Sequence, residues 1–381
     1  MASYARAGAS RKLESFTRAD FLRGLAFAGL SVGVAADVLG ACSSATFEPS
    51  GSTLPPTPTP SPTGAVALLA PSDAIDPAVL RAFSQRTGVA VRAAAPADGA
   101  TLPEALSGDA SYDVLLAPDP VVTALAREGV LHPLDMTLLN NFDYVQGAFR
   151  APPYDHGDPA RYSVPYQFST LGFTVWRDEA TAAPRGWADL WQPRFKRGVR
   201  FTVRGRSVIG IGLLSLGLRL GSRDRREVAT AAKRLIGLKP NLLLTRPAGM
   251  GKAPVTVCWS PRAVRDRRAG STSGPRYVLP VDGFEIATDA LCVPLSAANR
   301  LAAHAFLDFC LRPGVQRRIS LRLGTQSAEP EAWLYLPPRE RSFARDDLQL
   351  AHGQWLGDLG SFGAVYDRAW AAVAREWGTA A

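Results

Sequence analysis

Cys42 is the residue whose surroundings point most directly to a chemical role. Five arginines and lysines precede it, residues 24–36 are uncharged and apolar, and Leu39, Gly40 and Ala41 stand directly before the cysteine. An apolar run this short is typical of a cleaved export signal rather than of a membrane-spanning helix. Small residues before the cysteine let a peptidase reach the backbone, and the freed thiol can carry a lipid. We therefore predict a lipoprotein signal over residues 1–41 and a lipidated Cys42; the alternatives are a plain signal peptide and a short buried helix, with Cys42 incidental in either.

The export route has two candidates. Residues 17–23 resemble the twin-arginine export signature, but Ala19 stands where the second arginine of that signature would be. General secretion is therefore at least as well supported as twin-arginine export. By either route the mature chain would sit on the outer face of a cytoplasmic membrane.

The motifs that would carry catalysis are incomplete. Residues 29–33 fit the spacing of a hydrolase nucleophile turn but lie inside the predicted signal. Residues 249–252 resemble the end of a phosphate-binding loop, but Arg246 occupies the position of its first glycine and no Ser or Thr follows Lys252. The four histidines are scattered without metal-ligand spacing. We predict neither an enzyme nor a bound metal or cofactor.

Charge and cysteine content narrow the classes of partner. The chain carries a net charge of +9, but its basic residues are dispersed among acidic residues and turns, so we predict no nucleic-acid partner. Attraction to anionic lipid is compatible with the same charge. Cys258, Cys292 and Cys310 are an odd set that cannot all pair with one another. A bond between Cys258 and Cys292 is one possibility, but we expect all three to be small core residues.

The elements after the cysteine predict an α/β fold behind a tether. Residues 42–64 are rich in proline, threonine and serine, which predicts an extended linker. Short apolar runs then alternate with helical patterns, as at residues 77–87, where Gly88 is the expected stop. Such alternation predicts parallel sheets covered by helices. The spacing of apolar residues over 362–377 predicts a final amphipathic helix packed on the folded body.

Two extended segments, residues 162–166 and 289–294, interrupt this alternation and enclose a self-contained block of strands and helices. We expect them to run side by side as crossings between two lobes. The predicted boundaries are residues 65–165 with 288–330 for lobe 1, and residues 166–287 with 331–381 for lobe 2.

A series of short motifs keeps the order found in one protein family. These motifs are residues 72–77, Phe83, 87–88, 112–114, 128–135, 162–166, 187–191, 216–217, 238–241, 277–280, Asp289 and 293–294. Together they resemble the bacterial extracytoplasmic solute-binding proteins of ABC importers, in particular the spermidine/putrescine-binding group. The resemblance implies an α/β, two-lobed periplasmic-binding-protein-like (type II) fold with two interlobe crossings. It also implies a ligand cleft between the lobes and delivery of the solute to an ABC permease.

The resemblance further implies a binding site. Asp73, Trp259 and Asp289 keep the residue types with which the family holds amines, since carboxylates accept hydrogen bonds from ammonium and rings attract both cations and methylenes. An acidic pair of the family becomes Arg204 and Ser207 at a helix entry. Four positions that hold aromatic residues in the family are occupied here by Pro71, Ala74, Pro120 and Ala287. A position that holds serine in the family is occupied by Pro118. We predict Asp73, Trp259, Asp289, Arg204 and Ser207 as ligand-binding residues.

Arg204 decides the expected ligand. An arginine about 4 Å from a bound ammonium would repel it by roughly 4 kcal/mol at an effective dielectric of about 20. Unless Arg204 points to solvent, we expect weak or absent binding of putrescine and spermidine, and a zwitterionic or anionic small solute instead. The sequence thus predicts a monomeric, lipid-anchored receptor that is polyamine-binding-like with altered cleft chemistry. The alternative is a ligand-free scaffold or sensor derived from such a receptor.

Overall fold

The computed structural model describes residues 61–96, 102–106, 110–155, 160–176, 183–244, 253–269, 274–343 and 345–379. The predicted signal peptide, Cys42, most of the linker and the loop at residues 249–252 lie outside these ranges. The described residues all fall within one compact unit, Pro60–Ala381. Within the described ranges no helix combines the length and apolar character needed to cross a membrane.

The described strands form one hydrogen-bonded sheet, in the order β2-β1-β3-β8-β4-β6-β5, with β7 added to β4 and β9 added to β8. The strands are β1 (Ala65–Leu69), β2 (Ala90–Ala94), β3 (Val114–Pro118), β4 (Ser163–Val175), β5 (Val199–Phe201), β6 (Val255–Trp259), β7 (Arg276–Val278), β8 (Phe284–Cys292) and β9 (Gly353–Trp355). The predicted parallel pairing is found for β1 with β2 and β3 and for β5 with β6, but not for the crossing strands β4 and β8 where they pair with each other and with β3 and β6. β4 and β8 run antiparallel to each other, and each is antiparallel to a strand on its other side. The sheet is mixed because the crossing strands run against their neighbours.

The two predicted crossings are confirmed as neighbours. β4 and β8 pair over most of their length, with Pro165 opposite Ala290 and Gln167 opposite Asp289. β4 has 13 residues, which is long enough to pair with β8 in its first half and with β6 in its second. The short strand β9 adds a third passage beside β8, which the sequence analysis did not predict.

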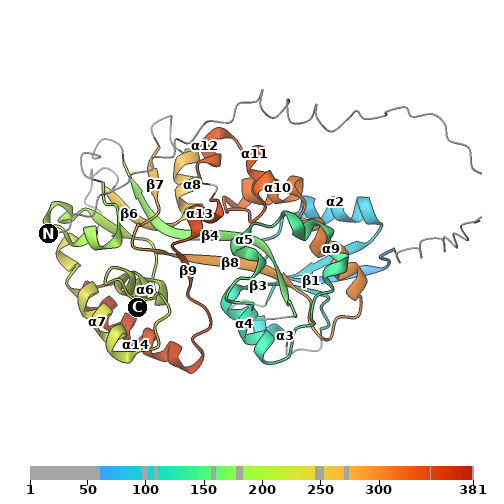
Figure 1. Ribbon diagram of the computed structural model, residues 1–381, viewed down its shortest axis with the longest axis horizontal. Helices are drawn as coiled ribbons and strands as arrows, with labels where there is room; N and C mark the ends of the chain where they lie inside the picture. The colour runs from blue at the N-terminus through green and yellow to red at the C-terminus, as the bar shows by residue number, and fades with distance from the viewer. Residues whose placement is uncertain are drawn as a thin grey trace, which may run out of the picture. The chain divides into compact units, whose positions relative to one another are not determined.

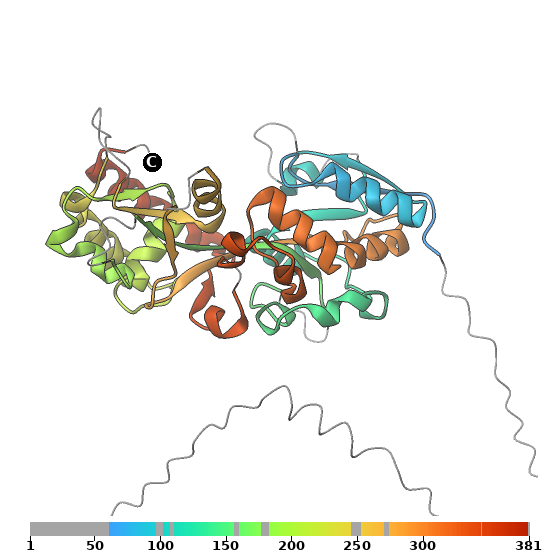
Figure 2. The ribbon, with the colours of Figure 1, turned by 90° about the horizontal axis from the view of Figure 1, so that it is seen from above.

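Helices cover this sheet in two groups. The helices are α2 (Pro77–Thr87), α3 (Leu102–Leu106), α4 (Asp119–Arg127), α5 (Gly147–Arg150), α6 (Arg206–Leu214), α7 (Arg225–Ile236), α8 (Ser260–Ala269), α9 (Arg300–Cys310), α10 (Pro313–Leu323), α11 (Pro330–Leu334), α12 (Pro338–Arg341), α13 (Asp347–Leu350) and α14 (Gly363–Trp377). In Figure 1, α2, α9 and β1 lie on the right, α6, α7 and α14 lie on the left, and β4 and β8 run between them. Figure 2 shows the same two groups from above.

Each group of helices encloses its own hydrophobic core. The first core contains Phe83 and Phe306, and the second contains Trp187 and Trp370. Separate cores on either side of shared strands give the fold its two lobes. The first-lobe core also holds Leu350, whereas α14 packs entirely in the second, so residues after 330 contribute to both cores. The exact lobe boundaries stay a prediction.

Local sequence signals account for how the individual helices begin and end. α2 occupies the predicted residues because the Asp76 side chain caps Ala78 at 2.8 Å and Gly88 ends the helix with a φ of 75°. α6 ends at Leu214, and Gly217 adopts a φ of 72° in the turn that follows. Residues 187–191 form a 3-10 helix.

The last helix and the cysteines agree with the sequence analysis. α14 spans Gly363–Trp377 and buries Trp370, Val373 and Trp377 in the second core. Cys258, Cys292 and Cys310 are free and buried, so the possible bond between Cys258 and Cys292 is not formed. Burial raises the pKa of each thiol.

Candidate functional site

Asp289 lies where the two lobes meet. It sits on β8 with Pro118 of β3 opposite on one side and Gln167 of β4 opposite on the other. The Gln167 Nε2 donates to the Asp289 Oδ2 at 2.7 Å, and the Thr325 hydroxyl donates to the Gln167 Oε1 at 2.8 Å. Because Thr325 occupies the oxygen of the amide, Gln167 presents its NH2 group to the carboxylate. Asp289 is thereby held in one orientation and is still partly exposed.

Asp73 approaches Asp289 from the first lobe. It is exposed in the turn between β1 and α2. Burial raises the pKa of Asp289, the hydrogen bond from Gln167 opposes this rise, and the negative charge of Asp73 adds to it. The structure therefore brings these two predicted carboxylates within electrostatic reach of each other, where they could share a cation.

Asp119 is a third carboxyl at this junction. It is the first residue of α4, it is 4% exposed, and its Oδ1 accepts from the Thr288 backbone N–H at 2.9 Å. Burial raises the pKa of Asp119 to about 7; the Thr288 hydrogen bond opposes this rise, and the charge of Asp289 adds to it. A carboxyl of this kind ionises readily once a cation is near.

Glu285 and Ser207 meet at the second-lobe end of the same strand. Glu285 is 6% exposed, and the Ser207 hydroxyl at the first turn of α6 hydrogen-bonds its carboxyl. Burial raises the pKa of Glu285 to about 8; Ser207 opposes this rise, and the charge of Asp119 adds to it. The Glu285 Oε2 has no hydrogen-bond partner among the described residues. Asp73, Asp289, Asp119 and Glu285 thus form a linked row of acids, which we call the acidic row.

The remaining two predicted residues lie apart from Asp289. Trp259 ends β6, is partly buried and packs against the second core opposite Leu171 of β4. Arg204 is exposed and lines a pocket of about 210 Å³ with Trp370 and Trp377 of α14. No contact joins Arg204 to the described members of the acidic row. Its role in ligand binding stays a prediction.

Sequence reasoning missed Asp119, Gln167, Glu285 and Thr325. One signal was available for Glu285, because it and Asp289 are the two acidic residues of this strand and, four residues apart, share a face. Asp119 directly follows a buried strand, where polar residues often line the edge of a sheet. Gln167 and Thr325 carried no comparable signal, because their contact joins residues 158 positions apart.

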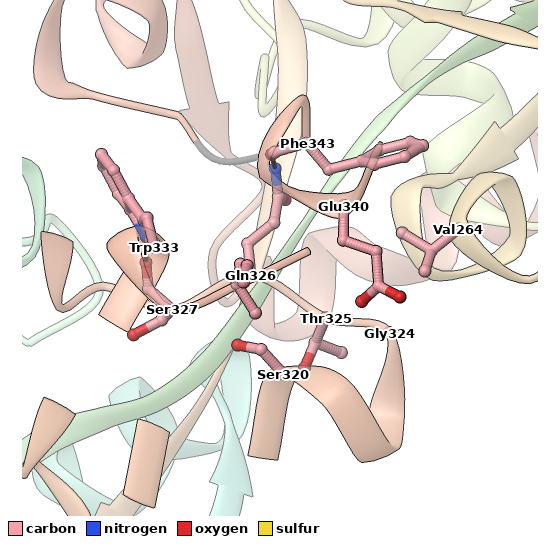
Figure 3. A pocket seen from close by; sticks show the side chains of 10 residues that line it. Val264, Ser320, Gly324, Thr325, Gln326, Ser327, Trp333, Glu340 and Phe343 are labelled. Atoms are coloured by element: carbon pink, nitrogen blue, oxygen red, sulfur yellow. Dashed lines mark hydrogen bonds between the residues drawn. The ribbon is translucent and has the colours of Figure 1, made fainter. Parts of the chain in front are cut away.

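Other hollows of the described region are distinct from this site. Figure 3 shows a cavity of about 10 Å³ surrounded by Gln326, Trp333, Glu340 and Phe343, which leaves room for about one water molecule. Gln326 is already engaged there, since it accepts from the Ser260 hydroxyl at 3.1 Å and donates to the Phe343 carbonyl. This cavity is a packing feature of the fold.

Two larger hollows, of about 900 and 630 Å³, adjoin each other at Pro153, Arg223 and Asp358. Asp358 accepts from Arg127 of α4 at 2.7 Å, which ties the loop after β9 to the first lobe. None of the five predicted ligand-binding residues lines either hollow. Within the described ranges, no group of three or more His, Cys, Asp or Glu side chains has a metal-binding arrangement.

Comparison with known proteins gives this arrangement a family. Residues 109–339 match the family model of the bacterial extracellular solute-binding proteins. The chain belongs to this family. The expected resemblance and the two-lobed α/β fold are both confirmed.

Relatives within the family share most of the chain. The spermidine/putrescine-binding periplasmic protein of Salmonella typhimurium is 26% identical over 305 residues, which cover 77% of this chain and 86% of the relative. The putrescine/agmatine-binding protein of Pseudomonas aeruginosa is 24% identical over 71% of this chain and 78% of the relative. Both relatives are named for the solutes that they bind.

Solved structures share the fold. The spermidine/putrescine ABC transporter substrate-binding protein of Streptococcus pneumoniae superposes with a TM-score of 0.72 at 23% identity, covering 83% of this chain and all of that protein (100%). The Tp0655 lipoprotein of Treponema pallidum gives a TM-score of 0.67 at 22% identity, covering 81% of this chain and 99% of that protein.

Proposed function

We propose that this protein is the lipid-anchored, extracytoplasmic substrate-binding protein of an ABC importer, and that it holds a small solute with at least one ammonium group between its lobes. The position of Asp289 carries the proposal. It lies on the strand that joins the lobes, is oriented by Gln167 and has Asp73 beside it. Ammonium can only donate hydrogen bonds and a carboxylate can accept several, so Asp289 can accept from an ammonium group as well as from Gln167.

The relatives support an amine, since they are named for binding spermidine, putrescine or agmatine. The residues at the family's aromatic positions support a different mode of binding from that of the relatives. Pro71, Ala74, Pro120 and Ala287 offer no ring to a bound methylene chain, which leaves Trp259 as the aromatic residue among the predicted contacts. We therefore propose altered cleft chemistry in which charge contributes more to affinity and aromatic stacking contributes less.

A zwitterionic or anionic solute is the second candidate, and it depends on Arg204 and Ser207. Ser207 lies at the first turn of α6, where a helix favours negative charge, but its hydroxyl is already bonded to Glu285. Arg204 lines a pocket with Trp370 and Trp377. A solute held through ammonium groups alone is therefore better supported than one that also needs an anion-binding residue. A ligand-free scaffold is less well supported still, because the unpaired oxygen of Glu285 is costly in an empty protein and a bound cation would remove that cost.

A thermal-shift panel of polyamines, monoamines, amino acids, organic acids and phosphates tests this function. A ligand at about 100 times its Kd stabilises the folded state by about 2.7 kcal/mol, which moves the melting temperature measurably. We expect solutes with an ammonium group to stabilise the protein and Asp289→Asn to abolish the effect. Asp367→Asn, at an exposed ion pair with Arg206, is the matched control. Stabilisation by anions alone, or an unchanged shift in Asp289→Asn, would contradict the proposal.

A further inference from the structure

We propose that Glu285 is a ligand-binding carboxylate and that the site takes a linear diamine laid along β8, with one ammonium group at Asp289 and the other at Glu285. This inference rests on the proposed function. It adds the residue that holds the far end of the solute and the spacing between its two amines.

The strand itself places the two carboxyls on one face. Side chains alternate along a strand, so Glu285, Ala287 and Asp289 point to the same side of β8. Phe284 and Ile286 point to the other side, where both are buried in the first-lobe core. The face of β8 that carries Asp289 therefore continues to Glu285.

The residue between the two acids is small. Asp289 and Ala287 are partly exposed, whereas Glu285 is buried at the deep end of the row. Ala287 adds only a methyl group to this face. A linear solute lying over Ala287 would meet a carboxylate, an apolar step and a second carboxylate, which matches the order ammonium, methylenes, ammonium.

One carboxyl oxygen of Glu285 lacks a hydrogen-bond donor in the part of the chain that the structure describes, and an ammonium group of the solute would supply one. Ser207 supplies one hydrogen bond, and the Oε2 has none among the described residues. Gln354 is the register partner of Glu285 on β9, but its Oε1 accepts from the Leu220 N–H at 3.0 Å instead. An unpaired buried carboxyl oxygen costs about 1–3 kcal/mol or more. A donor-only ammonium group would remove that cost.

The register also sets an aromatic ring in line with Glu285. Ser169 of β4 lies opposite Ala287, so the next residue on that face, Leu171, lies beside Glu285. Trp259 of β6 is paired with Leu171. Two strand spacings place Trp259 about 10 Å from Glu285 on the same face of the sheet. Trp259 is thus positioned beside the second-lobe end of the solute.

The strand gives the length of the solute. Four residues of strand span about 13 Å, and a charge-assisted hydrogen bond of about 2.8 Å at each end leaves about 7–8 Å between the nitrogens. An extended alkyl chain advances about 1.25 Å per bond of about 1.5 Å, so this separation corresponds to about five methylene groups. The expectation of weak diamine binding, drawn from Arg204 and from the lost aromatic positions, counted only Asp73 and Asp289 as carboxylates and did not include Glu285.

Calorimetry with a series of linear diamines of three to ten carbons tests the inference on the full protein. We expect affinity to be highest at about four to six carbons. Glu285→Gln keeps the shape and the Ser207 contact but removes the charge, so it should weaken the best diamine roughly ten- to hundredfold. The same variant should change the affinity for pentylamine less than about threefold, because a monoamine needs only Asp289.

Glu329→Gln is the matched control. Glu329 is 1% exposed and also has an unpaired Oε2, but it caps α11 away from β8. It should leave diamine affinity unchanged, and circular dichroism of both variants should match that of the parent.

Each other outcome is decisive. If the parent binds diamines and Glu285→Gln binds them equally well, or if affinity does not depend on chain length, the inference is wrong and the proposed function stands. If the parent binds another ammonium-bearing solute and no diamine, the inference is again wrong and the proposed function stands. If no solute of either panel binds, both are overturned.

Discussion

Glu285→Gln should make the ligand-free protein more stable at neutral and alkaline pH. Burial raises the pKa of Glu285 from 4.5 to about 8. A carboxyl with a higher pKa in the folded state binds more protons when the protein is folded. Glu285 therefore does not lower the free energy of unfolding below pH 4.5, but lowers it progressively as the pH rises toward 8. Glutamine stays neutral throughout. The variant therefore escapes a penalty that grows with pH.

The size of the penalty follows from the pKa difference. Each pH unit within the window between 4.5 and about 8 costs about 1.4 kcal/mol, so the difference between variant and parent should reach the order of 4 kcal/mol at pH 8. Asp119, the charged neighbour that acts on Glu285, also has a raised pKa, of about 7, so the parent itself should lose stability across the same range.

Urea unfolding at half-unit steps from pH 5 to pH 8.5, without ligand and in amine-free buffers, measures this difference. The parent and Glu285→Gln should differ little at pH 5 and diverge steadily above it. Glu376→Gln, at an exposed position on α14, should differ from the parent by the same small amount at every pH. A difference for Glu285→Gln that is independent of pH, or a variant less stable than the parent at pH 8, would refute the buried neutral carboxyl.

Three further predictions concern the anchor, the arginine and the second core. Cys42→Ala should move the protein from the membrane fraction to the soluble fraction, and equal membrane retention would contradict lipidation. Because Arg204 lines a pocket with Trp370, Arg204→Asp should leave diamine affinity within about twofold by calorimetry, whereas a rise of tenfold or more would place the guanidinium in the cleft. Trp370→Ala should lower unfolding stability by about 3–5 kcal/mol, since this side chain is only 7% exposed in the second core; a loss under about 1 kcal/mol in urea unfolding would argue against that packing.

The sequence predicted those parts of the fold that depend on local signals. The bounds of α2 follow from a capping aspartate, a proline and a glycine that stand within one short segment. The crossings were recognisable because their extended segments break the alternation of strands and helices. β9 was not, because three residues carry no periodicity and become a strand only by pairing with β8, about 70 residues earlier in the chain.

The candidate site was less predictable than the fold, because most of its contacts join residues far apart in the sequence. Asp73 and Asp289 were found through the resemblance, and the structure brings them together. Glu285 can be placed on the same side of the sheet as the ligand only when the register of β8 against β4 is known. A shift of one residue would turn its side chain into the first-lobe core. The contact between Ser207 and Glu285 likewise depends on how α6 lies over the sheet.

The position of α14 sets the order in which the chain can fold. Trp370 and Trp377 from this last helix pack against residues of α6 and α7, such as Leu213 and Leu235, that are made much earlier. Until the C-terminus arrives, the apolar faces of α6 and α7 have no cover and offer a surface for aggregation or for a chaperone. A chain that stops before α14 should therefore be degraded rather than accumulate as a receptor with one working lobe.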